Sequence, residues 1–146
     1  MSVEIKIINN STNALPEYAT KGASGMDIKA FLDQPVILEP LHRYLVPTGL
    51  FIELPSGYEA QIRPRSGLAI KQGITCLNTP GTIDSDYRGE IKIILINLSN
   101  ETQIISNGDR IAQLVVQQVE KVIWKPTKLL EETIRSNGGF GSTGSK

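Results

Sequence analysis

A polar stretch in the middle of the chain carries residue types that bind oxyanions. It reads "PRSGLAIK" and runs from Pro64 to Lys71. Arg65 offers a planar guanidinium that matches phosphate oxygens, Ser66 offers a hydroxyl, and Gly67 lacks the Cβ that would keep an anion from its backbone. Two interpretations stay open at this point: a phosphate-binding site, or a strand that ends in a polar turn with a solvated arginine.

A second stretch combines acids with a tyrosine. It reads "GTIDSDYRGEI" over residues 81–91, where a turn-rich segment leads into an apolar run. Asp84 and Asp86 would point the same way on an extended chain. Acids in turns usually cap backbone amides, however, so their spacing alone does not identify a catalytic base.

A third stretch, "GDRIAQLV" at residues 108–115, indicates a turn followed by a strand. Gln113 is a polar interruption of that strand. The stretch is compatible with a functional role and with an ordinary hairpin, in which Asp109 caps the turn and Arg110 forms a salt bridge.

The end of the chain differs in composition from the rest. It reads "RSNGGFGSTGSK" over residues 135–146, with four glycines and one aromatic residue, Phe140. Tails rich in glycine and serine bury too little apolar surface to offset the entropy lost on ordering. Composition alone therefore favours a frayed terminus, and the alternative is a mobile arm that takes part in the chemistry.

Size and charge restrict the classes of function. The 146 residues, 40% of them hydrophobic, suffice for one domain with one core. Fifteen basic residues balance fifteen acidic ones, so no overall field attracts nucleic acid or an anionic membrane, and neither is expected as a partner. Any anionic ligand must be held by local charge.

Metal and export signals are sparse. One cysteine, Cys76, precludes an internal disulfide, and together with one histidine, His42, it cannot form a usual zinc site. The first ten residues alternate charged and apolar types without a long apolar run, so neither a signal peptide nor a membrane span is expected there. We therefore expect a cytoplasmic protein, with His42 on a surface strand, Cys76 in the core and Trp124 as a packing anchor near the last strand.

The elements that must position these residues are short strands. Apolar and β-branched runs alternate with clusters of Pro, Gly, Asn and Asp, which predicts an all-β sandwich or barrel. The runs are "VEIKII", "PVILE", "RYLVPTGLFIEL", "YEAQIR", "GITCLN", "EIKIILIN", "QIIS" and "RIAQLVVQQVEKVI". Only "SGLAIKQ" shows helical periodicity.

Two of these runs differ in how their faces alternate. In "YEAQIR", Tyr58, Ala60 and Ile62 alternate with polar residues, as in a half-buried strand. "EIKIILIN" is apolar on both faces, which indicates a central strand, a subunit interface or the core of a sandwich.

Five stretches together resemble the five ordered motifs of the trimeric deoxyuridine triphosphatases (dUTPases). They are "ASGMDIKA" at residues 23–30, "PRSGLA" at 64–69, "GTIDSDYRGEI" at 81–91, "GDRIAQL" at 108–114 and "RSNGGFGSTG" at 135–144. The match covers nearly the whole chain in the expected order and spacing, which distinguishes it from the chance occurrence of one motif.

The resemblance implies a fold, an assembly and a reaction. The fold is a jelly-roll-like β-barrel or sandwich, of the dUTPase-like β-clip type, over residues 1–134, with residues 135–146 as a flexible glycine-rich arm. The assembly is a homotrimer with active sites at the subunit interfaces. The reaction is hydrolysis of dUTP to dUMP and diphosphate with Mg2+, which limits uracil incorporation into DNA and supplies dUMP for thymidylate synthesis.

The resemblance also implies how the nucleoside is bound. Asp84 would hold and deprotonate the water that attacks the α-phosphorus, and would accept a hydrogen bond from the sugar 3′-hydroxyl. Tyr87 would lie flat against the deoxyribose and leave no room for a 2′-hydroxyl. The hairpin from Asn78 to Ile83, with Thr82, would read the uracil edge through main-chain groups and exclude a thymine methyl.

The phosphates and the metal ion are matched to other motifs. The residues expected to grip the phosphate chain are Arg65, Ser66, Gly67 and Gln113. Asp27 would reach Mg2+ through water, while the phosphates supply most of the ion's ligands. Lys92 occupies a substrate-contacting position by the same resemblance. Structural roles, such as internal ion pairs, are expected for Asp86, Asp109 and Arg110.

The last motif is implied to close over the active site, usually from a neighbouring subunit. Arg135 would reach the β- and γ-phosphates and Phe140 would stack on the uracil, while the phosphate end would be wrapped by Gly139, Gly141, Ser142 and Thr143. We expect an arm that is disordered without nucleotide and ordered by a triphosphate. The family usually has glycine where this chain has Ser136, and serine would be disfavoured if that position needs a positive φ.

Two other functions share this scaffold. A dCTP deaminase has the same fold but a glutamate-centred site, whereas this chain has the "DSDYRG" pattern and the glycine-rich aromatic arm. A non-catalytic trimeric nucleotide-binding or regulatory module would be expected to lack Asp84, Tyr87 or the arm, and all three are present.

Overall fold

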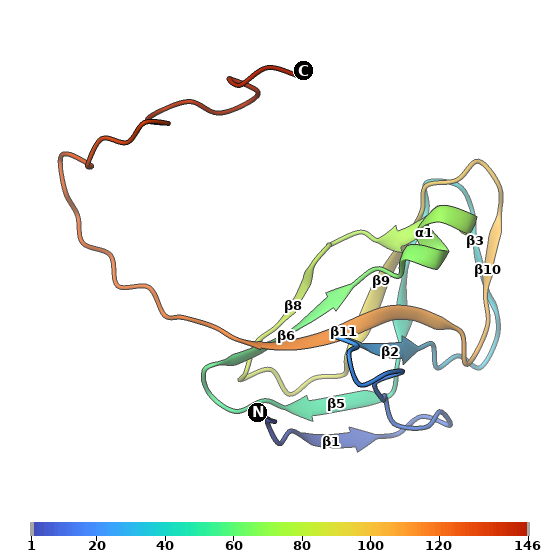
Figure 1. Cartoon of the computed structure of the whole chain (residues 1–146). Helices are drawn as coiled ribbons and strands as arrows, with labels where there is room; N and C mark the ends of the chain where they lie inside the picture. The colour runs from blue at the N-terminus through green and yellow to red at the C-terminus, as the bar shows by residue number, and fades with distance from the viewer. Residues whose placement is uncertain (1, 146) are drawn as a thin grey trace.

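The structure is a computed structural model that describes residues 2–145, and it is almost entirely β (Figure 1). Its elements in chain order are β1 (Lys6–Asn9), β2 (Met26–Lys29), β3 (Val36–Leu38), β4 (Arg43–Pro47), β5 (Leu50–Glu53), β6 (Tyr58–Arg63), α1 (Ser66–Gln72), β7 (Ile74–Cys76), β8 (Gly81–Ile83), β9 (Lys92–Asn97), β10 (Gln103–Ile105) and β11 (Arg110–Gln118). The all-β prediction is confirmed. None of the helical residues among those described forms a segment long and apolar enough to cross a bilayer.

The strands pair only in antiparallel fashion and enclose one core. A four-stranded sheet has the order β2-β11-β6-β8, and a three-stranded sheet has the order β4-β9-β7. Two further pairs, β1-β5 and β10-β3, complete the barrel. Strands from all four sheets contribute to the same core, through residues that include Ile28, Leu38, Val46, Ile52, Ile74, Ile93 and Leu95.

The alternation within β6 matches the pattern predicted for "YEAQIR". Ala60 and Ile62 are buried, whereas Arg63 at the end of the strand is exposed. The predicted helix "SGLAIKQ" is α1, which ends at Gly73 with a φ of 64°. Glycine tolerates this left-handed conformation, which lets the Gly73 N–H bond back to the carbonyls of Ala69 and Leu68.

Strand β9 has one face in the core and one face turned outward. Ile93 and Leu95 are buried, while Ile94 and Ile96 on the other face are only partly covered. Leu45 of β4 lies opposite Ile94 and is 50% exposed. The three-stranded sheet therefore presents an apolar outer face that the single chain does not cover.

The chain after β11 leaves the barrel and runs outward without joining a sheet (Figure 1). The last apolar run therefore ends as a strand at Gln118, short of the predicted Ile123. The expectation that Trp124 is a packing anchor is wrong within the single chain, because its side chain is 85% exposed. The physical reason is that this segment has no neighbouring sheet of its own chain to pack on. The expectation for Cys76 is confirmed, because it is buried in the core. The expectation for His42 holds in part, because this residue is exposed but precedes β4.

Candidate active site

One cavity brings together the predicted nucleoside-binding residues of the barrel, whereas Phe140, predicted to stack on the uracil, lies apart on the arm. It has a volume of about 470 Å³ and lies along β8 and β9 and the loop between them. Its predicted members are Asn78, Thr82, Ile83, Asp84, Tyr87 and Lys92. The remaining wall is mostly apolar and includes Leu45, Ile62, Ile91 and Ile93. An apolar pocket with a few polar groups at its edge suits a planar base with a sugar attached.

The hairpin that forms one wall is held close to β6 by a glycine. Strand β8 pairs with β6 in a register that places Gly81 opposite Ile62. A Cβ added at Gly81 would lie 3.3 Å from Nδ2 of Asn78 and 3.3 Å from Cβ of Ile62. An added Cβ would require Asn78 or Ile62 to shift by a few tenths of an ångström, so glycine permits this close approach of the hairpin to β6.

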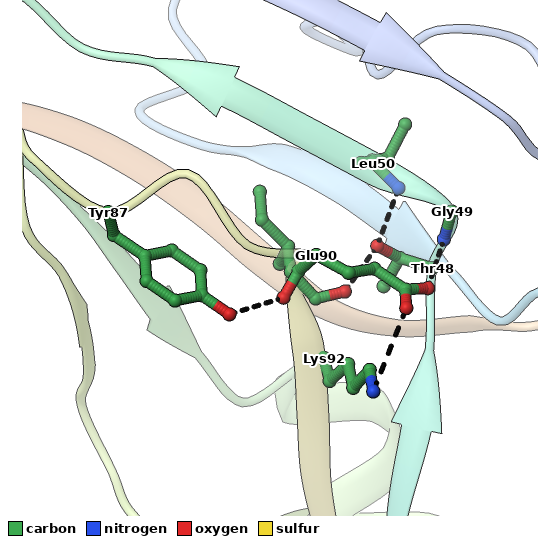
Figure 2. A network of polar contacts seen from close by, with 7 residues as sticks. Thr48, Gly49, Leu50, Tyr87, Glu90 and Lys92 are labelled. Carbon is green, nitrogen blue, oxygen red and sulfur yellow. Dashed lines mark hydrogen bonds and ion pairs between the residues drawn. The ribbon is translucent and has the colours of Figure 1, made fainter.

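The loop after β8 carries Asp84 and Tyr87 and is held together by its own hydrogen bonds. The Tyr87 amide donates to the Asp84 carbonyl at 3.1 Å, and the Arg88 guanidinium donates to the Ser85 carbonyl at 2.7 Å. The Tyr87 hydroxyl donates to the Glu90 carbonyl at 2.9 Å (Figure 2). Asp84 and Asp86 thus lie in a tight turn and not on the extended chain considered from spacing. The turn fixes the Asp84 backbone relative to Tyr87, and the hydrogen bond to Glu90 fixes the phenol ring.

A second group of predicted residues surrounds Asp27. The Arg65 guanidinium bonds to the Asp27 carboxylate at 3.0 Å and donates to the Arg110 carbonyl at 3.2 Å. Arg110 lies 3.6 Å from the other oxygen of Asp27. Gln113 on β11 is the cross-strand neighbour of Asp27. This arrangement orients the Arg65 fork, and Ser66 and Gly67 follow it as the exposed first residues of α1.

The predicted structural roles of two neighbours are confirmed by these contacts. Asp109 accepts a hydrogen bond from the Ser106 amide at 2.8 Å and so caps the turn before β11. Arg110 forms the ion pair with Asp27. Asp86 is exposed in the turn that follows Asp84.

The donor set around Asp27 bears on the Mg2+ that the resemblance implies. Both Asp27 oxygens face guanidinium groups, so the carboxylate is not free to enclose an ion directly. Among residues 2–145 there is no group of three acidic, histidine or cysteine side chains that could hold a metal. The residues present fit an ion that takes its inner ligands from phosphate oxygens and water, and they do not fit an ion caged by protein.

Arg65 of the second group and the residues of the nucleoside cavity line different cavities of the chain. Arg65 borders a cavity of about 410 Å³ with Arg110, whereas Asp84 and Tyr87 border the cavity beside β9. The arm lies apart from both, because the segment after β11 leads away from the barrel (Figure 1). Its predicted site residues are Arg135, Gly139, Phe140, Gly141, Ser142 and Thr143, and Phe140 is fully exposed.

The arm makes only local hydrogen bonds within the described residues. Arg135 donates to the Gly138 carbonyl at 2.8 Å, and the Ser136 amide donates to the Thr133 hydroxyl at 3.0 Å. Ser136 has a φ of 45° and Phe140 a φ of 50°. Ser136, which replaces the family's usual glycine, therefore does have a positive φ. Glycine adopts this left-handed conformation with less strain than serine.

Sequence reasoning missed Gly89 and Glu90, which contact the loop that carries Tyr87. A Cβ at Gly89 would lie 2.6 Å from Cζ of Tyr87. The Glu90 carboxylate accepts a hydrogen bond from the Gly49 amide at 2.9 Å (Figure 2). The only signal in the sequence is their place directly after Tyr87 and Arg88, and nothing in that spacing indicates a partner about 40 residues earlier in the chain.

Known proteins that resemble this chain are dUTPases. The dUTPase family model matches residues 11–144. A deoxyuridine 5'-triphosphate nucleotidohydrolase of Cytophaga hutchinsonii is 58% identical over 144 residues, which cover 99% of this chain and 94% of the relative. The protein with the same name from Finegoldia magna is 56% identical over 142 residues, covering 97% and 99%.

Solved structures give the same result for the fold. A mutant dUTPase of Staphylococcus bacteriophage 80alpha with dUpNHpp has a TM-score of 0.83 and 25% identity, covering 98% of this chain and 99% of the other. A mutant dUTPase from phage phi11 of S. aureus, solved with a structural Mg(II) ion, has a TM-score of 0.77 and 24% identity, covering 89% and 100%. From the family match and the identity to its bacterial relatives, the chain belongs to the dUTPase family.

Proposed function

We propose that this protein hydrolyses dUTP to dUMP and diphosphate, so that it limits uracil incorporation into DNA and supplies dUMP. The observation that carries the proposal is the placement of Asp84 and Tyr87 on one internally bonded loop beside a largely apolar cavity. This arrangement presents a carboxylate and an aromatic ring together at the mouth of a pocket for a base. Membership of the dUTPase family supports the same reaction.

The base is bound in the cavity against β8. Main-chain groups of the hairpin from Asn78 to Ile83 form hydrogen bonds with the uracil edge. Cytosine would place a donor where uracil has an acceptor, which leaves a buried group unpaired at a cost of about 1 to 3 kcal/mol. Gly81 holds the hairpin close to Ile62, and this closeness disfavours the extra methyl of thymine.

The sugar is selected by Tyr87. Its ring lies against the deoxyribose and occupies the space that a 2′-hydroxyl would need. A fixed ring is required, because a loosely apolar pocket rejects an added hydroxyl by only about a hundredfold. The hydrogen bond from the Tyr87 hydroxyl to the Glu90 carbonyl supplies that fixation.

The chemical step is attack by water on the α-phosphorus. Asp84 holds the water, accepts its proton as the new oxygen–phosphorus bond forms, and receives a hydrogen bond from the 3′-hydroxyl. The bond between the α-phosphorus and its bridging oxygen breaks, and diphosphate leaves. Positioning and charge stabilisation contribute as much as proton transfer, since a carboxylate is a weak base.

The phosphate chain is bound by the second group of residues. Arg65, Ser66, Gly67 and Gln113 contact its oxygens, and Lys92 contributes charge near the nucleoside cavity. Asp27 would hold Mg2+ through water when the ion is bound with the triphosphate, and the ion would supply neutralisation of the charge on the phosphate oxygens. The pairing of Asp27 with Arg65 supports this outer role.

The active protein is a homotrimer in this proposal. Arg65 and Asp84 line separate cavities of one chain, which supports a site that takes the two residues from neighbouring chains. Apolar side chains left exposed after β11, such as Ile123 and Trp124, are suited to burial between subunits. The arm, which follows a segment that runs outward from the barrel in Figure 1, closes over the site of a neighbour.

The proposal is tested by measuring diphosphate release from dUTP, UTP, dTTP and dCTP with Mg2+. We expect rapid release from dUTP and at least a hundredfold less from each of the others. Deamination of dCTP without diphosphate release would instead identify a dCTP deaminase. Absence of release from all four nucleotides would overturn the proposed hydrolysis.

A further inference from the structure

The loop that carries Asp84 and Tyr87 is held together by hydrogen bonds within the loop, and the end that follows Tyr87 leads into β9. Its internal hydrogen bonds involve Asp84, Ser85, Tyr87 and Arg88. None of these bonds ties the loop to another element. The loop is attached to the barrel at both ends: Ile83 of β8 pairs with Ala60 of β6 just before Asp84, and the chain enters β9 after Glu90 and Ile91. The attachment nearer to Tyr87 is the one before β9.

That point of attachment is Glu90 with the residue after it (Figure 2). The Glu90 carboxylate accepts from the Gly49 amide at 2.9 Å and lies 3.8 Å from the Lys92 ammonium. The next residue, Ile91, donates its amide to the Leu50 carbonyl at 2.8 Å. The end of the loop is thus hydrogen-bonded to Gly49, between β4 and β5, and to Leu50 at the start of β5.

The partner of Glu90 cannot easily move. Gly49 has a φ of 69°, and a Cβ there would lie 2.8 Å from the amide nitrogen of Ser11. Only glycine fits so close to the Ser11 backbone, and the direction of the Gly49 N–H is fixed by this conformation. Glu90 is therefore bonded to a rigid donor.

The same short segment also fixes the Tyr87 ring. The ring packs on the backbone of Gly89, where a Cβ would lie 2.6 Å from Cζ of Tyr87. The hydroxyl of Tyr87 donates to the main-chain carbonyl of Glu90. The Tyr87 ring is therefore held against the Gly89–Glu90 backbone.

We propose that Glu90 is a positioning residue for Tyr87: its carboxylate holds the loop to Gly49, and its carbonyl holds the phenol ring, so that it sets the discrimination between deoxyribose and ribose. Glu90 acts through Tyr87 and does not contact the reacting atoms. The inference rests on the proposed function, in which Tyr87 excludes the 2′-hydroxyl.

The test compares Glu90→Ala with Glu90→Gln. The measured quantity is kcat/KM for dUTP divided by kcat/KM for UTP. The alanine variant loses the bond to Gly49, and we expect this ratio to fall about tenfold as the ring becomes mobile. The glutamine variant keeps an oxygen that accepts from Gly49, and we expect a ratio within about threefold of the wild type. An unchanged ratio in a folded Glu90→Ala protein would overturn the inference.

A control variant and a substitute for Glu90→Ala separate a positioning role from a general loss of structure. Glu39→Ala removes an exposed acid whose carboxylate accepts a hydrogen bond from the Thr102 hydroxyl, outside the loop, and the ratio should not change. If Glu90→Ala does not fold, Glu90→Asp retains the charge but is one methylene too short to reach Gly49, and a ratio equal to that of the wild type would then overturn the inference.

Failure of the inference can be told apart from failure of the proposed function. A wild-type protein that does not hydrolyse dUTP contradicts the function itself. A different set of results would contradict only the role of Glu90. In it the wild type prefers dUTP, Tyr87→Ala loses this preference, and Glu90→Ala keeps it. The proposed function would then be unaffected.

Discussion

At the scale of single residues, the two carboxylates that matter most have opposite surroundings. Asp27 is held by Arg65 and faces Arg110, which neutralises its charge. Asp84 takes part in no ion pair among residues 2–145 and lies exposed beside the cavity. This contrast suits an outer-sphere role for Asp27 and a water-holding role for Asp84.

Replacing Asp84 by asparagine tests the role given to its carboxylate. Asp84→Asn keeps the shape of the side chain but removes the proton acceptor, so we expect kcat to fall by about a hundredfold or more. The affinity for a nonhydrolysable dUTP analogue should change little. Single-turnover rates and calorimetric binding measure the two quantities. A near-normal rate would show that the Asp84 carboxylate is not the catalytic base.

The buried thiol predicts how stability depends on pH. Burial raises the pKa of Cys76 to about 11, whereas the unfolded thiol titrates at about 8.5. The unfolded chain therefore loses its proton first, so this contribution is complete below about pH 8.5 and is lost as the pH rises toward 11. Guanidinium unfolding at pH 8 and pH 10 should show a smaller loss of stability in Cys76→Ala than in the wild type. Equal losses in the two proteins would contradict this account.

At the scale of elements, hydrophobic pattern predicted most strands and the one helix. The alternation in β6 and the seven residues of α1 appear as the sequence indicated. Strands β2 and β8 did not stand out, because "MDIK" and "GTI" are short and hold few apolar residues. Both become strands through pairing with β11 and β6, which are distant in sequence. Tertiary pairing of this kind leaves no local signal.

The candidate site was predictable in its residue types but not in its arrangement. Motif order identified the groups around Arg65 and Asp84, yet no spacing indicated that they line different cavities of one chain. Nor could spacing reveal the contact between Glu90 and Gly49, which depends on how β5 meets the start of β9.

The arm is the element with the clearest predicted effect. Ordering about ten residues costs roughly 10 kcal/mol or more, and stacking on Phe140 returns only about 1 to 3 kcal/mol. Phosphate contacts must supply much of the remainder. We expect a nonhydrolysable triphosphate to protect residues 135–146 from proteolysis, with weaker protection by dUMP. Identical digestion with and without the analogue would contradict this.

Removing the arm tests its contribution to activity. A chain that ends at Ile134 keeps every strand of the barrel, so we expect it to assemble normally while losing most of its dUTP hydrolysis. Steady-state kinetics and sedimentation measure the two properties. Full activity in the truncated protein would show that the tail is only a frayed terminus.

At the scale of the whole molecule, one chain leaves large apolar surfaces uncovered. The outer face of the three-stranded sheet is only half-buried, and Ile123 and Trp124 extend into solvent. Exposed apolar area of this extent is typical of a subunit interface. Three chains of 16.0 kDa would sediment as a particle of about 48 kDa.

Shared sites predict that two inactive variants restore each other's activity. Arg65→Ala damages one contributor to a site and Asp84→Asn damages the other. When the two proteins are unfolded together and reassembled in equal amounts, about a quarter of the sites should combine an intact Arg65 with an intact Asp84. Recovery of about a quarter of wild-type activity supports sites built between chains. No recovery, in mixed trimers verified by mass spectrometry, would contradict them.

The central claim is that water attacks the α-phosphorus of dUTP. The most direct measurement is a single turnover of dUTP with Mg2+ in water enriched in oxygen-18, followed by mass spectrometry of the products. We expect dUMP and diphosphate, with one heavy oxygen in the dUMP phosphate and none in the diphosphate. Label in the diphosphate, or formation of dUDP and phosphate, would contradict the account.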